Sequence, residues 1–222
     1  MKQIHIQMKL KEISMEKIIN YPNGDTYTGQ VVDDKKEGIG AYKFQSGARY
    51  EGQFAGDVKE GRGLYYFTNG DVMVGNWSND NLVGRVVYRF ANGDQYEGEI
   101  KDNELHGRGV YRYHDKNIYQ GAFANGKQHG EGLFVYATGG RYVGEWENGK
   151  RHGKGMLDFG DGNRYEGGWE NDQRSGRGRQ IFANGEQFVG YFKNNQRNGD
   201  GIYLYANGVT EEGCWKDDIK IS

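Results

Sequence analysis

The chain has 222 residues, of which 38 are glycine, 17 are tyrosine and only 35% are hydrophobic. A chain this polar cannot fill the deep core of an ordinary globule, although 14% aromatic residues can cover one face of a thin sheet. The formal net charge of −2 gives no strong pull toward nucleic acid, and there is no run of 18 apolar residues that could span a membrane as a helix. A single cysteine, Cys214, excludes a disulfide framework and favours a reducing, cytoplasmic compartment.

The first 26 residues resemble a weakened copy of the pattern that residues 27–210 repeat. Apolar residues alternate with polar ones at Ile4, Ile6, Met8 and Leu10, which is the period-2 pattern of a strand with one covered face. We therefore expect residues 1–26 to form a degenerate capping repeat. For residues 8–19 the pattern leaves both a strand and a helix open.

A period of 23 residues organises residues 27–210 without one insertion or deletion. The first position of each period is Tyr27, Tyr50, Met73, Tyr96, Tyr119, Tyr142, Tyr165 or Phe188, and a glycine stands two residues after each of them. A fixed period of this length is the signature of a repeat architecture. The sequence thus predicts eight full repeats over residues 27–210.

Every repeat has the same internal plan. A first strand carries aromatic-x-Gly-x-aromatic, as in Tyr142 to Trp146, and a loop of about five polar residues is expected after it, as in Asn148 to His152. A second strand is expected to begin at Gly-x-Gly and to carry two alternating aromatics. A tight turn, often Asn-Gly, then leads into the next repeat.

These signals predict an all-β fold: an elongated, twisted, single-layer antiparallel meander of stacked hairpins with a grooved aromatic face. The glycines inside the strands are expected to let a ring on one strand lie flat over the backbone of the next. In RYVGEWENGKRHGKG, residues 141–155, we expect Gly144, Gly153 and Gly155 to admit Tyr142 and Trp146 in this way. To keep the rings on one face, the Asn-Gly turn should hold an odd number of residues, for example Asn69-Gly70-Asp71 with a glycine bulge.

Residues 211–222 read as the first strand of a ninth repeat and are expected to form a C-terminal half-repeat cap. Gly213 and Trp215 are in frame, and the sequence ends where the second strand is expected to begin. Either this edge is solvated or a partner pairs with it.

The repeat resembles the MORN (membrane occupation and recognition nexus) repeat. The residues that carry the resemblance fit the pattern YEGEW-x-x-G-x-x-HG-x-G over residues 27–215, and weakly over residues 4–26. The resemblance implies stacked hairpins in a twisted, grooved sheet, and functions such as scaffolding in cilia and the cytoskeleton, membrane junctions and lipid binding. This chain departs from the pattern at Met73, at Val86 and at residues 114–117, which puts only the local geometry in question.

Two recurring elements invite a metal-binding or phosphate-binding interpretation that their spacing and context reject. His106, His129 and His152 fall two strands apart, roughly 9 to 10 Å, which is too far for one metal ion. The Gly-x-Gly elements precede strands rather than a helix, so they are not phosphate loops. With no nucleophile, base and acid standing out from the repeats, we expect no enzyme activity, no cofactor and no metal.

Two surfaces are predicted to bind partners. The first is the aromatic face, with Tyr96, Tyr119, Phe123, Tyr142, Trp146, Tyr165 and Trp169. The second is the hairpin-loop edge, which is apolar at Leu82, Val83 and Leu105 and basic at Lys127, Lys150, Arg151, Arg174 and Arg197.

The function that fits best is a non-catalytic scaffold that binds protein partners in a multi-subunit assembly. The resemblance, rather than any chemistry, places that assembly in a cilium or flagellum (axonemal or radial-spoke-like) or in the cytoskeleton. Two alternatives remain: an adaptor at a membrane surface that binds acidic phospholipid headgroups through the basic edge, and a regulatory subunit of a separate enzyme.

Overall fold

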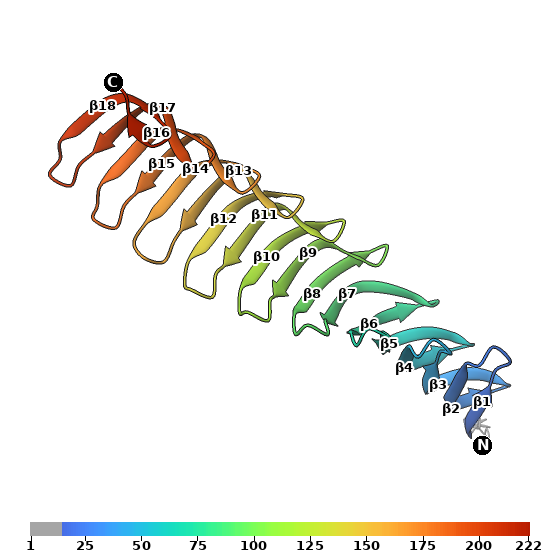
Figure 1. Ribbon diagram of the computed structural model, residues 1–222. Helices are drawn as coiled ribbons and strands as arrows, with labels where there is room; N and C mark the ends of the chain where they lie inside the picture. The colour runs from blue at the N-terminus through green and yellow to red at the C-terminus, as the bar shows by residue number, and fades with distance from the viewer. Residues whose placement is uncertain (1–14) are drawn as a thin grey trace, which may run out of the picture. The chain divides into compact units, whose positions relative to one another are not determined.

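The structure, a computed structural model, describes residues 15–222, none of which is helical (Figure 1). It divides into two compact units, unit 1 ending at Ala91 and unit 2 beginning at Asn92. Within each unit every strand pairs antiparallel with the next strand in sequence. The predicted all-β antiparallel meander is therefore confirmed.

The strands alternate between seven and nine residues from β2 onward, until the last short strand. Unit 1 holds β1 (Met15–Asn20), β2 (Thr26–Val32), β3 (Lys35–Lys43), β4 (Arg49–Ala55), β5 (Val58–Tyr66), β6 (Val72–Ser78) and β7 (Asn81–Arg89). Unit 2 holds β8 (Gln95–Lys101), β9 (Glu104–Arg112), β10 (Ile118–Ala124), β11 (Lys127–Val135), β12 (Arg141–Glu147), β13 (Lys150–Asp158), β14 (Arg164–Glu170), β15 (Gln173–Ile181), β16 (Gln187–Lys193), β17 (Gln196–Leu204), β18 (Thr210–Lys216) and β19 (Ile219–Lys220).

The hairpin inside each repeat closes more tightly than the sequence pattern predicts. Between β12 and β13 only Asn148 and Gly149 lie outside the strands, with φ of 51° and 83°. Two consecutive residues with positive φ form a type I′ turn, whose twist matches that of the flanking strands. The expected five-residue loop is therefore wrong: the second strand begins at Lys150, before the Gly-x-Gly.

Gly153, the first glycine of Gly-x-Gly, has φ of 58° at the register shift between β12 and β13. A positive φ at such a shift is typical of a β-bulge, and glycine adopts it without steric cost. Gly153 therefore bends the strand and does not make room for a ring, so the expectation for this glycine is wrong.

The turn between repeats is a three-residue loop. The amide of Phe67 donates to the carbonyl of Asp71 (2.9 Å), and the amide of Gly70 donates to the carbonyl of Phe67 (3.1 Å). Gly70 has φ of 92°, as expected for a glycine bulge. The odd loop length is confirmed, although the loop is Thr68-Asn69-Gly70, one residue earlier than expected.

The two ends of the array agree with the sequence pattern only in part. The alternating residues Ile4 to Leu10 lie outside the described residues, as do residues 8–14 of the stretch left open between strand and helix. From Met15 onward that stretch is strand β1, paired with β2. At the other end, β18 pairs with the two-residue strand β19 through Trp215 and Lys216, so a short second strand is present where none was expected.

The core of each unit lies on one face of its sheet, which we call the ring face. The first-strand aromatics point to it, and in β2 the buried residues Tyr27, Gly29 and Val31 alternate with the more exposed Thr28 and Gln30. The opposite side is called the outer face. The apolar side chains buried on the ring face include Tyr27, Val31, Tyr50, Phe54, Met73, Trp77 and Val86 in unit 1, and Tyr96, Tyr119, Phe123, Tyr142, Trp146, Leu157, Tyr165, Trp169, Phe188, Phe192 and Trp215 in unit 2.

Candidate partner-binding surfaces

A cross-strand pair of glycines under each buried tyrosine lets the ring lie against the backbone. Gly144 and Gly155 are partners across β12 and β13, and a Cβ placed on Gly155 would lie 2.5 Å from Cζ of Tyr142. The Tyr142 hydroxyl donates to the carbonyl of Glu145 at 3.0 Å, so the buried phenol is satisfied. The predicted packing of a ring over strand glycines is thus confirmed for Gly144 and Gly155.

The same phenol bond recurs wherever the repeat has its tyrosine. The hydroxyls of Tyr27, Tyr50, Tyr96, Tyr119 and Tyr165 also donate to the carbonyl three residues on, at 2.6 to 3.0 Å. Burial is the main cause that raises the pKa of Tyr27, Tyr50 and Tyr165 to about 12, and it raises the pKa of Tyr119 and Tyr142 further. These side chains are neutral at physiological pH and form the core of the sheet.

The buried rings also join successive repeats edge to face. In unit 2, Tyr142 meets both Trp146 of its own repeat and Trp169 of the next, with centroids 5.3 and 5.4 Å apart. Edge-to-face pairs at this distance add about 0.5 to 1.5 kcal/mol each beyond area burial. Such contacts run from Tyr96 to Trp215 in unit 2, and they link Tyr27, Phe54, Tyr50 and Trp77 in unit 1.

The seven aromatic residues predicted to bind partners all belong to this buried set. Tyr96, Tyr119, Phe123, Tyr142, Trp146, Tyr165 and Trp169 have exposed fractions of 7% or less. Glycines and other core rings pack against them, and the guanidinium groups of Arg151 and Arg174 lie over three of them, so a partner can reach little of their surface. Their role in partner binding stays a prediction, while their structural role as core is plain.

A second set of rings on the ring face remains partly accessible, and the sequence predicts its positions without singling it out. These ring rows comprise a first set near the ends of β3, β5, β7, β9, β11 and β17, namely Tyr42, Tyr65, Tyr88, Tyr111, Phe134 and Tyr203. A second set lies in the turns between repeats: Phe44, Phe67, Phe90, Tyr113, Tyr136, Phe159, Phe182 and Tyr205. All are half-buried except Phe159 and Tyr205, which are 41% and 36% exposed. In unit 1 they form a continuous path of ring contacts from Tyr21 to Phe90.

Carboxylates at the turns hold the ring rows in place. Asp94 accepts hydrogen bonds from the Tyr111 hydroxyl at 2.7 Å and from the amide of His114, one repeat on, at 2.8 Å. Burial alone would raise the pKa of Asp94, but these bonds outweigh it and lower the pKa. Asp25 and Asp71 make the same bonds, to Tyr42 and Gln45 and to Tyr88 and Ala91. An aspartate stands two residues before the first position of three repeats, at residues 25, 71 and 94. This recurrence is the sequence signal that could have located these turns.

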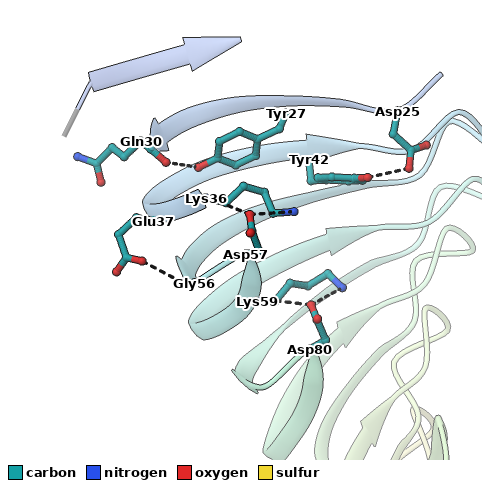
Figure 2. A network of polar contacts seen from close by, with 10 residues as sticks. All are labelled: Asp25, Tyr27, Gln30, Lys36, Glu37, Tyr42, Gly56, Asp57, Lys59 and Asp80. Carbon is teal, nitrogen blue, oxygen red and sulfur yellow. Dashed lines mark hydrogen bonds and ion pairs between the residues drawn. The ribbon is translucent and has the colours of Figure 1, made fainter. Parts of the chain in front are cut away.

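Cations at the opposite end of the hairpins fasten several repeats to the next. Lys36 donates through its amide to Asp57 at 2.9 Å, and its ammonium lies 3.8 Å from the same carboxylate (Figure 2). Lys59 repeats the arrangement with Asp80. Both lysines turn onto the ring face, where the Lys59 ammonium lies 5.1 Å from the centroid of Trp77.

Three arginines of the predicted basic edge occupy the same position in unit 2 and are not a free edge. Arg151 bonds Asp172 through Nε at 3.0 Å, and Arg197 does the same with Asp218. Arg174 bonds Asn195, and burial lowers its guanidinium pKa. Of the predicted basic residues only Lys127 and Lys150 are exposed. The arginines clamp repeats together, and whether this edge meets lipid is a separate prediction that the fold does not test.

The predicted apolar edge is also divided by the structure. Leu82 and Leu105 stand at the same position of their repeats as Lys36, since these positions are separated by multiples of 23 residues. They therefore face the ring side, where they are half-buried. Val83, the next residue, is 43% exposed. Of the three predicted residues, Val83 therefore offers the most apolar surface at the loop edge.

The third repeat replaces its missing ring with aliphatic side chains. Met73 stands where other repeats have tyrosine, and Val86 where they have the second glycine. A Cβ on Gly75 would meet Leu82 Cδ1 at 2.7 Å and Val86 Cγ1 at 3.2 Å instead of a phenol. Val86 is 1% exposed, so it fills the volume that a tyrosine ring occupies elsewhere. The departures from the repeat pattern compensate for each other.

The three recurring histidines lie on separate strands, His106 on β9, His129 on β11 and His152 on β13. Within residues 15–222, no three or more His, Cys, Asp or Glu side chains gather in a way that could hold a metal ion. Nor does that part of the chain contain a helix of the length and hydropathy needed to cross a membrane.

Comparison with known families gives one match. The profile described as "MORN repeat" matches eight consecutive segments: residues 27–49, 50–72, 74–95, 96–118, 119–141, 142–164, 165–187 and 188–210. A comparison with curated proteins found no matching sequence.

The chain was also compared with solved structures. The wild-type TCP10 domain of CPAP from Danio rerio is 15% identical, with a TM-score of 0.52 over 91% of this chain and 94% of that one. The TCP domain of Drosophila melanogaster SAS-4, solved in complex with a proline-rich motif of Ana2, is 18% identical, with a TM-score of 0.44 over 70% of this chain and 85% of that one. The first similarity shows the fold alone, and the second is too weak to carry an argument.

Proposed function

Because the chain belongs to the MORN repeat family, we propose that it is a non-catalytic scaffold that binds protein partners within a larger assembly. The observation that supports this most is the accessibility of the ring rows. No second layer of described residues covers them, although sheets normally bury an apolar face against something. Aromatic side chains are also the residues most often found at the energetic centre of protein interfaces.

The partner is proposed to lie on the ring rows rather than on the buried core rings. Phe159 and Tyr205 are the most exposed members and are the natural anchors. Their turns are held by hydrogen bonds within the loop, from Phe159 N to Asn163 O and from Tyr205 N to Val209 O. Rings on turns fixed in this way lose little conformational freedom on binding.

The test uses the full chain carrying an affinity tag, expressed in cells of its source and isolated with its assembly. Phe159→Ser combined with Tyr205→Ser should reduce the recovery of co-purifying proteins. The matched control is Ile39→Ser combined with Ile202→Ser, because these side chains are 60% and 41% exposed on the outer face. Equal recovery with both pairs of substitutions would remove the ring rows from the proposal.

The assembly is proposed to be ciliary or cytoskeletal, axonemal or radial-spoke-like, in the cytoplasm. This part rests on the family resemblance and not on the geometry. Localisation of the tagged full chain by light microscopy tests it, and a distribution that excludes cilia and cytoskeleton would contradict it.

The lipid-adaptor alternative has less support, because Arg151, Arg174 and Arg197 are engaged within the sheet. It now depends on Lys127 and Lys150. Flotation with vesicles containing acidic phosphoinositides, with and without Lys127→Gln and Lys150→Gln, distinguishes it from the scaffold. Recovery of an enzyme in fixed ratio with the chain would favour the remaining alternative, a regulatory subunit.

A further inference from the structure

On the outer face, four repeats cover the first glycine of Gly-x-Gly with a side chain of their own. Each time a Gln or Glu of the first strand accepts a hydrogen bond from the amide directly after this glycine. The bonds are Ile39 to Gln30 (2.8 Å), Arg62 to Gln53 (3.2 Å), Arg108 to Glu99 (3.3 Å) and Lys154 to Glu145 (2.9 Å). A bulge takes such an amide out of the strand ladder, so the side chain supplies an acceptor for it.

The repeat that begins at Tyr165 cannot cover its glycine in this way. Gly168 stands where the other four repeats have Gln or Glu, and a Cβ added to it would collide with the carbonyl oxygen of Ser175. A Cβ placed on Gly176 would meet nothing within 4 Å beyond its chain neighbours, whereas at Gly153 that position lies against the Glu145 carboxylate. The space next to the Arg177 amide is therefore open.

This open space belongs to a hollow of about 600 Å³ on the outer face of unit 2. Its lining includes Gly168, Gly176 and Arg177 together with Lys154, Val143 and Met156. Lys154 is the cross-strand partner of Gly168, so its side chain stands beside the opening. Among the described residues neither the Arg177 guanidinium nor the Lys154 ammonium has an ion-pair partner.

Two acidic side chains also line the hollow, Glu131 and Glu166. Glu166 has Arg164 at 3.9 Å on its own strand. Glu131 lies on β11, where it pairs with Glu145 of β12. Because Arg177 lies on β15, Glu131 is on the far side of the hollow from Arg177. Glu166 thus has a cation of its own, whereas Arg177 and Lys154 on either side of Gly168 have no ion-pair partner among the described residues, which favours an anionic acceptor at the open amide.

We propose that this hollow binds the side-chain carboxylate of a glutamate from a protein partner. The Arg177 amide and guanidinium donate to it, and the Lys154 ammonium stands across Gly168 from them. Glu99 and Glu145 show the same acceptor in the same place when the chain supplies it. The inference rests on the proposed function only for the source of the glutamate, which is a protein partner.

The first test is an NMR titration of the ¹⁵N-labelled full chain with N-acetyl-glutamate N-methylamide. The Arg177 amide signal should shift saturably, whereas the amides of Ile39 and Arg108 should not move, because Gln30 and Glu99 already occupy their acceptor positions. The glutamine analogue should bind more weakly, since hydrogen bonds to a charged acceptor are roughly twice as strong. No saturable shift at Arg177, or equal shifts at all three amides, overturns the site.

Two variants sharpen the result. Glu145→Ala should open a second position and produce a saturable shift at the Lys154 amide. Arg177→Gln, at an exposed side chain, should weaken probe binding by about tenfold without unfolding the chain. If the Lys154 amide signal of Glu145→Ala does not shift with the probe, a carboxylate from outside the chain cannot replace that of Glu145, and the proposal is wrong.

The partner is tested separately from the site. Arg177→Gln in the full chain should lower recovery of the co-purifying proteins, and full recovery would show that no partner glutamate uses the hollow. Loss of the site in the titration leaves the ring-row experiment unaffected, so failure of this inference and failure of the scaffold proposal are distinguishable.

Discussion

The guanidinium carbon of Arg151 lies 4.3 Å from the centroid of the Trp169 ring, one repeat further along the chain. The same arginine bonds the carboxylate and the carbonyl oxygen of Asp172 in the turn of that next repeat. One side chain thus ties the core ring and the turn of its neighbour to its own strand. Because repeats in such arrays are stable mainly through their interfaces with neighbours, we expect contacts of this kind to decide stability.

Removing the Arg151 clamp should therefore cost stability without changing the fold. We expect Arg151→Ala to lower the free energy of unfolding by about 1 kcal/mol, from the lost ion pair and cation–π contact. Chemical denaturation measures it, and a double-mutant cycle with Asp172→Ala isolates the pair. Lys150→Ala, one residue away and exposed, is the control and should change little. If Arg151→Ala is as mild as Lys150→Ala, the clamp contributes nothing.

The third repeat suggests a sharper test of how rings and glycines fit. Gly155→Val should destabilise the chain by about 3 kcal/mol or more, because the new side chain meets the Tyr142 ring. Adding Tyr142→Met reproduces the natural combination of Met73 and Val86, and it should recover at least about 1 kcal/mol of the loss. Thermal denaturation of the single and double variants measures this coupling. If the effects of the two substitutions are additive, the valine does not fill the volume that the tyrosine ring leaves.

Acid should loosen the turns through Asp71 and Asp94. Hydrogen bonds lower the pKa of both carboxyls in the folded chain. Their contribution to stability is thus present above the unfolded pKa of about 3.9, and it is lost as pH falls through the lower folded value. Asp94→Asn should flatten part of this pH dependence while keeping an acceptor for the His114 amide, as Asn117 and Asn163 do for Ala137 and Ala183. An unchanged acid profile in Asp94→Asn argues against the assignment.

Alkali should unfold the chain through its core tyrosines. Burial raises the pKa of Tyr27, Tyr50 and Tyr165 to about 12, above the ordinary value of about 10. A raised folded pKa contributes stability that is fully present below pH 10 and lost as pH rises toward 12. Ultraviolet titration of phenolate absorbance should show these rings ionising together with unfolding. Their ionisation near pH 10 in a chain that is still folded would show that they are not core.

The period of 23 residues and the ring-Gly-ring pattern are enough to predict the meander, its strand order and the packing of a ring over Gly144 and Gly155. They cannot locate the hairpin turn, because Asn148 and Gly149 form a two-residue turn only when both adopt positive φ, and the polar residues after them look like a loop. The segment Lys150, Arg151 and His152 has no apolar residue that would indicate a strand. This segment is a strand because it pairs with β12.

The candidate surfaces are harder to predict for a related reason. Sequence spacing shows which residues share a face but not how deeply each is covered. Tyr142 and Tyr136 both point to the ring face. Glycines beneath Tyr142 admit its ring into the core, whereas Tyr136 lies at a turn and stays half-buried. Arg151 resembles part of a basic edge in the sequence because its aromatic and acidic neighbours, Trp169 and Asp172, come from the next repeat.

The claim that the ring rows bind protein partners is tested most directly by hydroxyl-radical footprinting. The full chain is oxidised alone and in its isolated native assembly, and the oxidation of individual side chains is read by mass spectrometry. Phe159 and Tyr205 should be oxidised more slowly in the assembly, whereas Ile39 and Ile202 on the outer face should keep their rates. Equal oxidation of Phe159 and Tyr205 in the two samples would contradict the account.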